Sequence, residues 1–202
     1  MFIETLSVII IFFGSIIFHE CAHGWVAYRL GDPTAKLAGR LTLNPYRHID
    51  ILGMIIVPFI LKSIGLFPLG WAKPVPVTFA NLNSPKRDMI FVATAGPLVN
   101  ILLAGISCLL IKLNLLLDSK TILIFAFEIN LILAIFNLIP IPPLDGSRIV
   151  MGVLPRNLNQ SYSQLEPFGL IIVLVLLNYG LFDFILIIVE LIANQLGIHP
   201  TP

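Results

Sequence analysis

Charged residues are scarce in this chain, which has 202 residues of which only 11% are Asp, Glu, Lys or Arg. The usual share is about 25%. A chain so poor in charge, with 57% hydrophobic residues and a mean hydropathy of +0.97, is neither disordered nor an ordinary soluble domain. A basic surplus is also missing, because 12 Lys and Arg face 11 Asp and Glu, and this excludes a nucleic-acid-binding protein. The composition predicts a polytopic membrane protein.

Cysteine is nearly absent as well. The two cysteines, Cys21 and Cys108, both lie in apolar surroundings. Neither their number nor their spacing is typical of a disulfide scaffold or of a zinc site built from cysteines.

Long apolar runs are what the chain has in abundance. A spanning helix needs about 20 mostly apolar residues, and three of five apolar segments meet this cleanly. Pro58 and Lys62 interrupt one of the other two, and Asn178 and Asp183 interrupt the last. In chain order the segments are 2–30, 51–69, 89–113, 121–139 and 168–196. We predict an all-α, single integral-membrane domain over 1–202, with a core at about 2–155 and a C-terminal apolar region at 167–197.

The first apolar segment ends in the motif His19-Glu20-Cys21-Ala22-His23. On a helix, residues four apart share a face, so both imidazoles can bind one metal ion while Glu20 acts on a water molecule. Ionisable side chains inside a membrane are costly, and a cluster of them indicates a functional site. The alternative is a polar helix end at which the two histidines reach the interface without binding metal.

A catalytic zinc usually has three protein ligands, so the two histidines need a partner. His48, His199, Glu128 and Asp145 are the candidates. Glu128 and Asp145 are 17 residues apart, or roughly 25 Å along a helix, so both cannot reach one zinc unless the helix breaks. Asp145 follows a proline-rich stretch and precedes a glycine, which suits irregular backbone beside a wet cavity. We therefore expect Asp145 as the third ligand and a structural role for Glu128.

Three sequence blocks together resemble the site-2 protease family of intramembrane zinc metalloproteases, and most closely its small bacterial and archaeal members without PDZ or CBS domains. The resemblance covers residues 14–155 and rests on the H-E-x-x-H motif, on Gly96-Pro97-Leu98-Val99-Asn100, and on 137–146, which reads NLIPIPPLDG. The blocks Leu43-Asn44-Pro45 and 70–77 also look like that subgroup. Departures, at Tyr46 and Cys21, touch no required ligand.

The resemblance implies that His19, His23 and Asp145 bind Zn²⁺ and that Glu20 is the catalytic acid and base. It implies that Asn137 binds the substrate or the developing oxyanion. Further substrate contacts are expected at Asn100, Trp71 and Pro74. The implied reaction is hydrolysis of peptide bonds within or near transmembrane segments of membrane-protein substrates, as in regulated intramembrane proteolysis.

Two other functions use the same residues. A membrane metal transporter would show several intramembrane acids or histidines along a path, often in repeated segments; here only Glu128, Asp183 and Glu190 are available and no repeat is present. A non-proteolytic metal-binding membrane protein would use the same ligands. A non-enzymatic adaptor, such as an inactive homologue, would be expected to lack a ligand or the glutamate, and this chain retains all four residues. A proteolytic enzyme in the lipid bilayer therefore remains the favoured interpretation, with the oligomeric state left open.

The topology follows from the shared metal. His23 and Asp145 each lie near the C-terminal end of an apolar segment, so both segments must run in the same direction, with an odd number of crossings between them. The segment 51–69 then re-enters or lies in the interface. This arrangement leaves only Lys112 and Lys120 on one side and the other ten of the 12 basic residues on the opposite side. The positive-inside rule makes the latter side cytoplasmic, so we expect a multi-pass plasma-membrane protein with the active site nearer the cytoplasmic face.

The stretch Gly70–Thr78 is proline-rich and is expected to be extended. It can offer a backbone edge to a peptide, or it can be an interfacial loop, since proline limits strand pairing. Asn44 and His48 can similarly belong to a solvated loop or support the metal ligands.

Overall fold

The computed structural model describes residues 2–115 and 120–198, of which most lie in helices and none in a strand. His199, one candidate ligand from the sequence, falls outside these residues. The long helices are α1 (Phe2–Arg29), α4 (Pro85–Lys112) and α5 (Lys120–Leu138). The shorter ones are α2 (Thr34–Leu37), η1 (Pro45–Arg47), η2 (Leu52–Ile56), α3 (Val57–Ser63), η3 (Phe79–Asn81), α6 (Asp145–Val153), α7 (Arg156–Ser163), η5 (Glu166–Phe168), α8 (Gly169–Asn178) and α9 (Leu181–Gln195).

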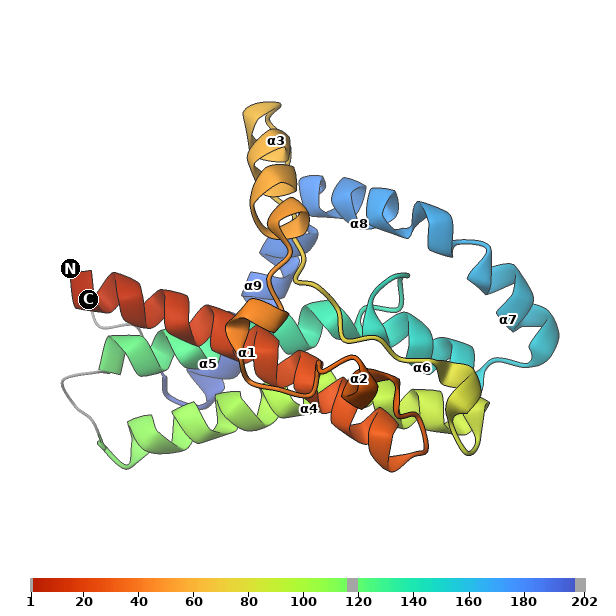
Figure 1. Ribbon diagram of the computed structural model, residues 1–202. Helices are drawn as coiled ribbons and strands as arrows, with labels where there is room; N and C mark the ends of the chain where they lie inside the picture. The colour runs from red at the N-terminus through yellow and green to blue at the C-terminus, as the bar shows by residue number, and fades with distance from the viewer. Residues whose placement is uncertain (1, 116–119, 199–202) are drawn as a thin grey trace.

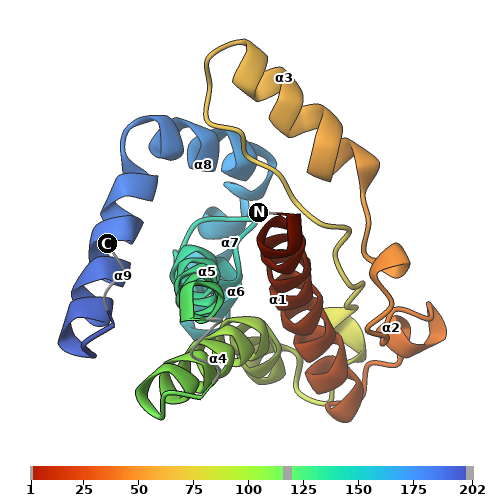
Figure 2. The same ribbon diagram turned by 90° about the vertical axis from the view of Figure 1, so that its left-hand side faces the viewer.

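The three long helices form the bundle that carries the site (Figures 1 and 2). In Figure 1, α1 and α5 run in the same direction and α4 runs against them, which is the arrangement that the topology argument requires. By length and hydropathy four helical stretches could cross a membrane, namely Thr5–Arg29, Pro85–Lys112, Lys120–Leu138 and Asn157–Asn178. The chain is therefore an all-α, polytopic membrane protein.

Small residues let α4 approach its neighbours closely. Its buried face includes Ala93, Gly96, Pro97, Asn100 and Ala104, which follow the three- and four-residue spacing of one helix face. Without bulky side chains there, α4 can lie against both α1 and α5. This packing brings Asn100 to the histidines of α1.

The second apolar segment forms no spanning helix. Its helical part, Leu52–Ser63, is too short to cross a bilayer, and the chain then returns without regular structure through residues 66–78. Figure 2 shows α3 standing apart from the bundle, and Leu52, Ile55 and Phe59 on this helical part are exposed. The short length agrees with the prediction that this segment does not cross.

The last apolar region is two helices rather than one. Gly180, with a φ of +94°, separates α8 from α9, and a left-handed backbone of this kind ends a helix readily at glycine. Side chains of α9, including Ile185 and Val189, pack on Phe127 of α5 in the largest apolar cluster. The break at Asn178–Gly180 thus lets α9 turn back onto the bundle.

Candidate metal centre and its cavity

The two histidines of the motif converge in the middle of the bundle. They lie one turn apart on α1, and their Nε2 atoms are 3.0 Å from each other. Both are buried, with exposures of 6% for His19 and 8% for His23. The spacing of four residues on a helix thus brings the two ring nitrogens close enough to bind one metal ion, as the sequence predicts.

Asp145 completes the cluster from the first turn of α6. Its Oδ2 lies 3.1 Å from Nε2 of His19 and 3.2 Å from Nε2 of His23. Gly146 makes this approach possible, because a Cβ there would lie 2.2 Å from the carbonyl oxygen of Leu138 at the end of α5. Among the described residues, His19, His23 and Asp145 form the only group of potential metal ligands of this kind.

Hydrogen bonds orient both rings. Nδ1 of His23 donates to the carbonyl oxygen of Val92, at 2.7 Å. Nδ1 of His19 donates to Oδ1 of Asn100, at 2.5 Å, and the amide of Asn100 in turn donates to Oδ1 of Asn130, at 2.8 Å. With both Nδ1 atoms engaged as donors, both Nε2 atoms present lone pairs to a metal.

The ligand spacing fits zinc. In a tetrahedral site with zinc–ligand distances of about 2.0–2.1 Å, neighbouring ligand atoms lie about 3.3 Å apart, and the three separations here are 3.0, 3.1 and 3.2 Å. Gly96 of α4 leaves the room for the rings, because a Cβ there would lie 2.4 Å from Nε2 of His23 and 2.5 Å from Nε2 of His19. Two neutral imidazoles and a carboxylate form a donor set that is typical of catalytic zinc.

A cavity of about 420 Å³ lies beside the cluster and is lined by both His19 and Glu20. Side chains of α1, α5 and α8 make its walls mostly apolar: Phe12, Ile16, Leu133, Phe136, Leu170 and Val173. The irregular segment 69–74 closes another side. The cavity therefore suits an apolar ligand that reaches both Glu20 and the cluster.

Glu20 touches the irregular segment directly. Its Oε2 accepts a hydrogen bond of 2.7 Å from the backbone N–H of Val75. The same segment is held by Arg40, which donates to the carbonyl oxygens of Lys73 and Pro74, and by Asp32, which accepts from the N–H of Thr78. These contacts were not foreseen from the sequence, because they join backbone groups whose partners depend on the path of an irregular chain.

The other predicted site residues divide into two groups. Asn137, Trp71 and Pro74 all line the cavity, and contact of these three residues with a substrate stays a prediction. Asn100 does not: it is fully buried between His19 and Asn130. The expectation that Asn100 contacts substrate therefore needs correction, because the side chain is placed to orient a metal ligand instead.

Two residues considered as alternatives lie outside the cluster. The ring of His48 is buried, with 2% exposure, and its Nε2 atom donates to the carbonyl oxygen of Thr42 rather than facing the cluster. Glu128 is partly buried on α5 and belongs to no group of potential metal ligands in the described chain. Asn130 was missed by the sequence interpretation; its only signal there is that it is an amide inside an apolar segment.

Comparisons with known proteins agree with this geometry. The model of Peptidase family M50 matches residues 115–177. A Bacillus subtilis protein named "Putative zinc metalloprotease YwhC" is 36% identical over 182 residues, which are 85% of this chain and 80% of that protein. Rip2 of Mycobacterium tuberculosis, described by the same words, is 29% identical over 80% of this chain.

Coverage of the relatives varies. The matched region is 62% of the length of Rip2. MJ0611 of Methanocaldococcus jannaschii, again described in those words, is 34% identical over 66% of this chain and 63% of its own length. No solved structure matches the chain. The similarity to YwhC extends over most of both proteins, and the described structure contains a ligand cluster that suits zinc. The chain therefore belongs to Peptidase family M50, the site-2 proteases, which are zinc-dependent metalloproteases of membranes.

Proposed function

We propose that this protein hydrolyses peptide bonds within or next to transmembrane segments of membrane-protein substrates. The carrying observation is that His19, His23 and Asp145 converge beside an apolar cavity that Glu20 also lines. An apolar cavity inside a helical membrane bundle favours a substrate that arrives from the bilayer. Three ligands and an adjacent carboxylate are the groups that metal-assisted hydrolysis requires.

In this proposal the three ligands hold zinc, which when bound acidifies water and polarises a carbonyl group. Glu20 takes the proton from the attacking water and returns it to the leaving amine. The backbone N–H of Val75 donates to Oε2 of Glu20 and so orients this carboxylate. Asn130 and Asn100 keep His19 in the tautomer that leaves Nε2 free.

In this proposal Asn137 binds the substrate carbonyl. Its side chain lines the cavity, and its amide nitrogen donates to the carbonyl oxygen of Leu133 in the preceding turn. A side-chain amide carries two N–H groups, so the second is free to donate to the substrate carbonyl or the oxyanion.

The segment 69–74 offers the substrate a backbone edge. Among the described residues, neither Gly70 nor Ala72 has a hydrogen bond at its N–H, and both residues line the cavity. A peptide that pairs with this edge must be extended. A helical substrate must therefore unwind before cleavage, which favours substrates with helix-weakening residues near the cut.

We also propose that the site lies nearer the cytoplasmic face of the cell membrane. The C-terminal ends of α1 and α5 point the same way in Figure 1, and His23 and Asp145 lie in sequence near these two ends. Most Lys and Arg residues lie in the segments at that end, whereas Lys112 and Lys120 lie at the other. This distribution supports the orientation because basic residues are retained on the cytoplasmic side.

The test is cleavage of a single-span substrate by the purified protein in proteoliposomes, compared between wild type and Glu20→Gln. We expect cleavage within the apolar stretch by the wild type and loss of at least about 1,000-fold in the variant, with zinc content unchanged in both. Product masses would locate the cut. Equal cleavage by both proteins would reveal a contaminating protease and contradict the role of Glu20.

The same variant separates proteolysis from metal transport. A transporter with these ligands would move zinc into the vesicles, and Glu20→Gln would leave that flux largely intact, since the ligands remain. Zinc uptake that is preserved in Glu20→Gln, without cleavage by the wild type, would favour transport over our proposal.

A further inference from the structure

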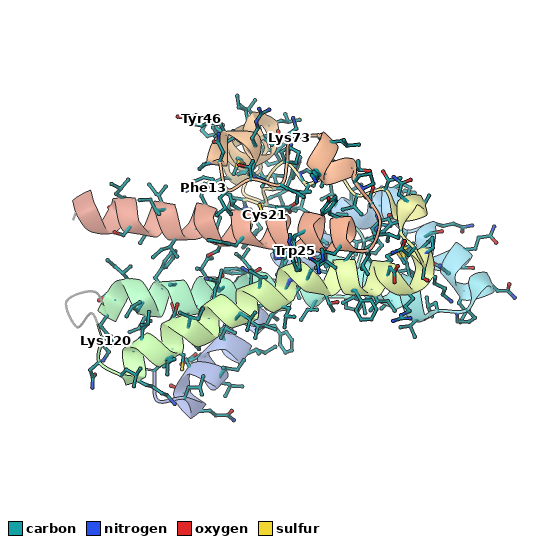
Figure 3. The ribbon with its side chains drawn as sticks, turned by 60° about the horizontal axis from the view of Figure 1, so that its bottom comes forward. Phe13, Cys21, Trp25, Tyr46, Lys73 and Lys120 are labelled. Atoms are coloured by element: carbon teal, nitrogen blue, oxygen red, sulfur yellow. The ribbon has the colours of Figure 1, made fainter. Side chains whose placement is uncertain are left out.

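A second cavity shares the lining residue Pro74 with the first one. It has a volume of about 450 Å³ and is lined by Arg40, Tyr46, Arg47, Ile49, Lys73 and Pro74, among others. Three of these side chains are cationic, and no acidic residue lines the cavity. Figure 3 shows Tyr46 and Lys73 on the same side of α1.

The three cations have no counter-charge. No carboxylate pairs with Arg40, Arg47 or Lys73 in the described parts of the chain. Asp50, three residues after Arg47, accepts hydrogen bonds from the N–H groups of Leu52 and Gly53 instead. Three unpaired cations around one hollow repel each other unless an anion joins them.

Arg40 is the strongest sign of a ligand. It is only 7% exposed, and its Nε is buried without a hydrogen-bond partner among the described residues. Its guanidinium donates only through one terminal nitrogen, to the carbonyl oxygens of Lys73 and Pro74. A buried donor without an acceptor is costly, and a ligand with several acceptor oxygens would offset this cost by accepting from the other N–H groups of the guanidinium.

We infer that this cavity binds the phosphate group of an anionic phospholipid. Phosphate offers multiple acceptor oxygens and a charge that matches the planar donors of arginine. The cavity volume of about 450 Å³ is many times the roughly 30 Å³ that one water molecule occupies, so the cavity has room for more than a small anion. Ile49 and Pro74 provide apolar surface for the glycerol portion.

The neighbouring chain makes a lipid the favoured source of the phosphate. Ile51, Leu52 and Ile55 follow the cavity in sequence and are exposed by 62%, 55% and 61%. In a membrane protein, apolar residues that are exposed on the surface of the fold face lipid tails. A headgroup beside them would lie at the cytoplasmic surface in the orientation proposed above, where anionic lipids attract basic clusters.

Binding there would act on the catalytic cavity. Pro74 lines both cavities, and the next residue, Val75, donates its N–H to Glu20. A phosphate that holds Arg40 and Lys73 therefore fixes the segment from which Glu20 receives its hydrogen bond. This consequence rests on the proposed proteolytic function, whereas the binding site itself does not.

The test measures binding directly, with headgroup-labelled phosphatidylglycerol and the purified full chain in neutral detergent. Removing two cations with Arg47→Gln/Lys73→Gln should weaken binding about thirtyfold, at roughly five- to sixfold for each charge. The control, Lys62→Gln/Lys86→Gln, removes the same charge from exposed positions that line neither cavity and should bind like the wild type. Zinc content shows that each variant is folded.

A second arm replaces the lipid with inorganic phosphate, followed by calorimetry. Phosphate binding that the cavity variant loses, without phosphatidylglycerol binding, would support the anion site but overturn the lipid as its source. Equal lipid binding by the wild type and both variants, or none by any of them, would overturn the inference.

Activity gives the final comparison, in phosphatidylcholine vesicles with and without phosphatidylglycerol. The lipid should raise cleavage severalfold in the wild type and in the control but not in Arg47→Gln/Lys73→Gln. Unchanged cleavage in spite of lipid binding would overturn the link to Glu20. Absence of cleavage in every membrane would instead count against the proposed function and leave the binding result standing.

Discussion

The two sides of the catalytic cavity are built in different ways. On the metal side, His19 and His23 are buried on one helix, and partners on α4 hold their rings. On the opposite side, residues 66–78 have no regular structure, and side-chain hydrogen bonds with Glu20, Asp32 and Arg40 hold this segment. The difference indicates a division of labour: ligand atoms need fixed positions, whereas the peptide-facing side can adjust to different substrates.

The largest effect on the metal side is expected from a side chain that takes the space of the histidine rings. We expect Gly96→Ala to weaken zinc binding by more than about 100-fold, beyond the range for loss of an orienting hydrogen bond, because the new methyl group would lie 2.4–2.6 Å from the two rings. Zinc stoichiometry after dialysis against a chelator measures this. Gly105→Ala on the same helix is the matched control, since a Cβ there meets nothing within 4 Å; zinc loss in both variants would contradict a steric cause.

A smaller effect is expected from loss of ring orientation. Asn100→Ala leaves the ligands in place but removes the acceptor of the His19 Nδ1 proton. Zinc affinity should fall about 10- to 100-fold, as measured by competition with a chromophoric chelator. Ser107→Ala provides the comparison, because Ser107 is also buried on α4 but its hydroxyl donates within the helix to Leu103. An Asn100 variant with wild-type affinity would show that the metal side does not depend on this contact.

The opposite side should respond in turnover rather than in metal binding. Asp32 ties the segment to α2 and η3 through Thr34, Thr78 and Asn81. We expect Asp32→Asn to slow cleavage about three- to tenfold, or roughly 0.6–1.4 kcal/mol in the barrier, with zinc affinity unchanged. Asp183→Asn, the same change on α9, should leave both quantities unaltered. Reduced zinc binding in Asp32→Asn would erase the distinction between the two sides.

The smallest expected effect concerns pH. Burial would raise the pKa of Asp32, but hydrogen bonds from the side chains of Thr34 and Asn81 and from the N–H of Thr78 outweigh it, so the pKa lies below its ordinary value of 3.8. A lowered pKa stabilises the fold above the unfolded-state value, and this contribution is lost as pH falls through the folded-state value.

Consequently, the stability difference between wild type and Asp32→Asn should be constant from about pH 5 to about pH 8 and should shrink only below about pH 4. Thermal unfolding in detergent across this range measures it. A difference that instead varied with pH near neutrality would show that another group controls the segment.

The grouping of His19, His23 and Asp145 could be predicted from the sequence because each of these residues carries a local signal. His19 and His23 share a helix face by spacing alone, and Asp145 was selected by its place after a proline-rich break. Asn100 was misassigned for the opposite reason: which face of α4 meets α1 depends on packing between helices, through the small residues around Gly96. Likewise, the bond between Glu20 and Val75 depends on the path of an irregular segment, for which residue periodicity carries no signal.

The coarse topology was also accessible, since the shared metal required α1 and α5 to run in parallel. The interruption around Asn178 was visible in the sequence, but whether it bent one helix or separated two was not. That outcome is decided by Ile185 and Val189, which pack on α5. The sequence shows that a helix has an apolar face, but it does not show which helix that face contacts.

X-ray absorption at the zinc edge of the purified protein tests the central claim most directly. If His19, His23 and Asp145 hold the metal, the spectrum will show two imidazole nitrogens and oxygen ligands at about 2.0–2.2 Å, without sulfur. A sulfur shell at about 2.3 Å, or a third imidazole, would place the zinc elsewhere in the chain and contradict the site described above.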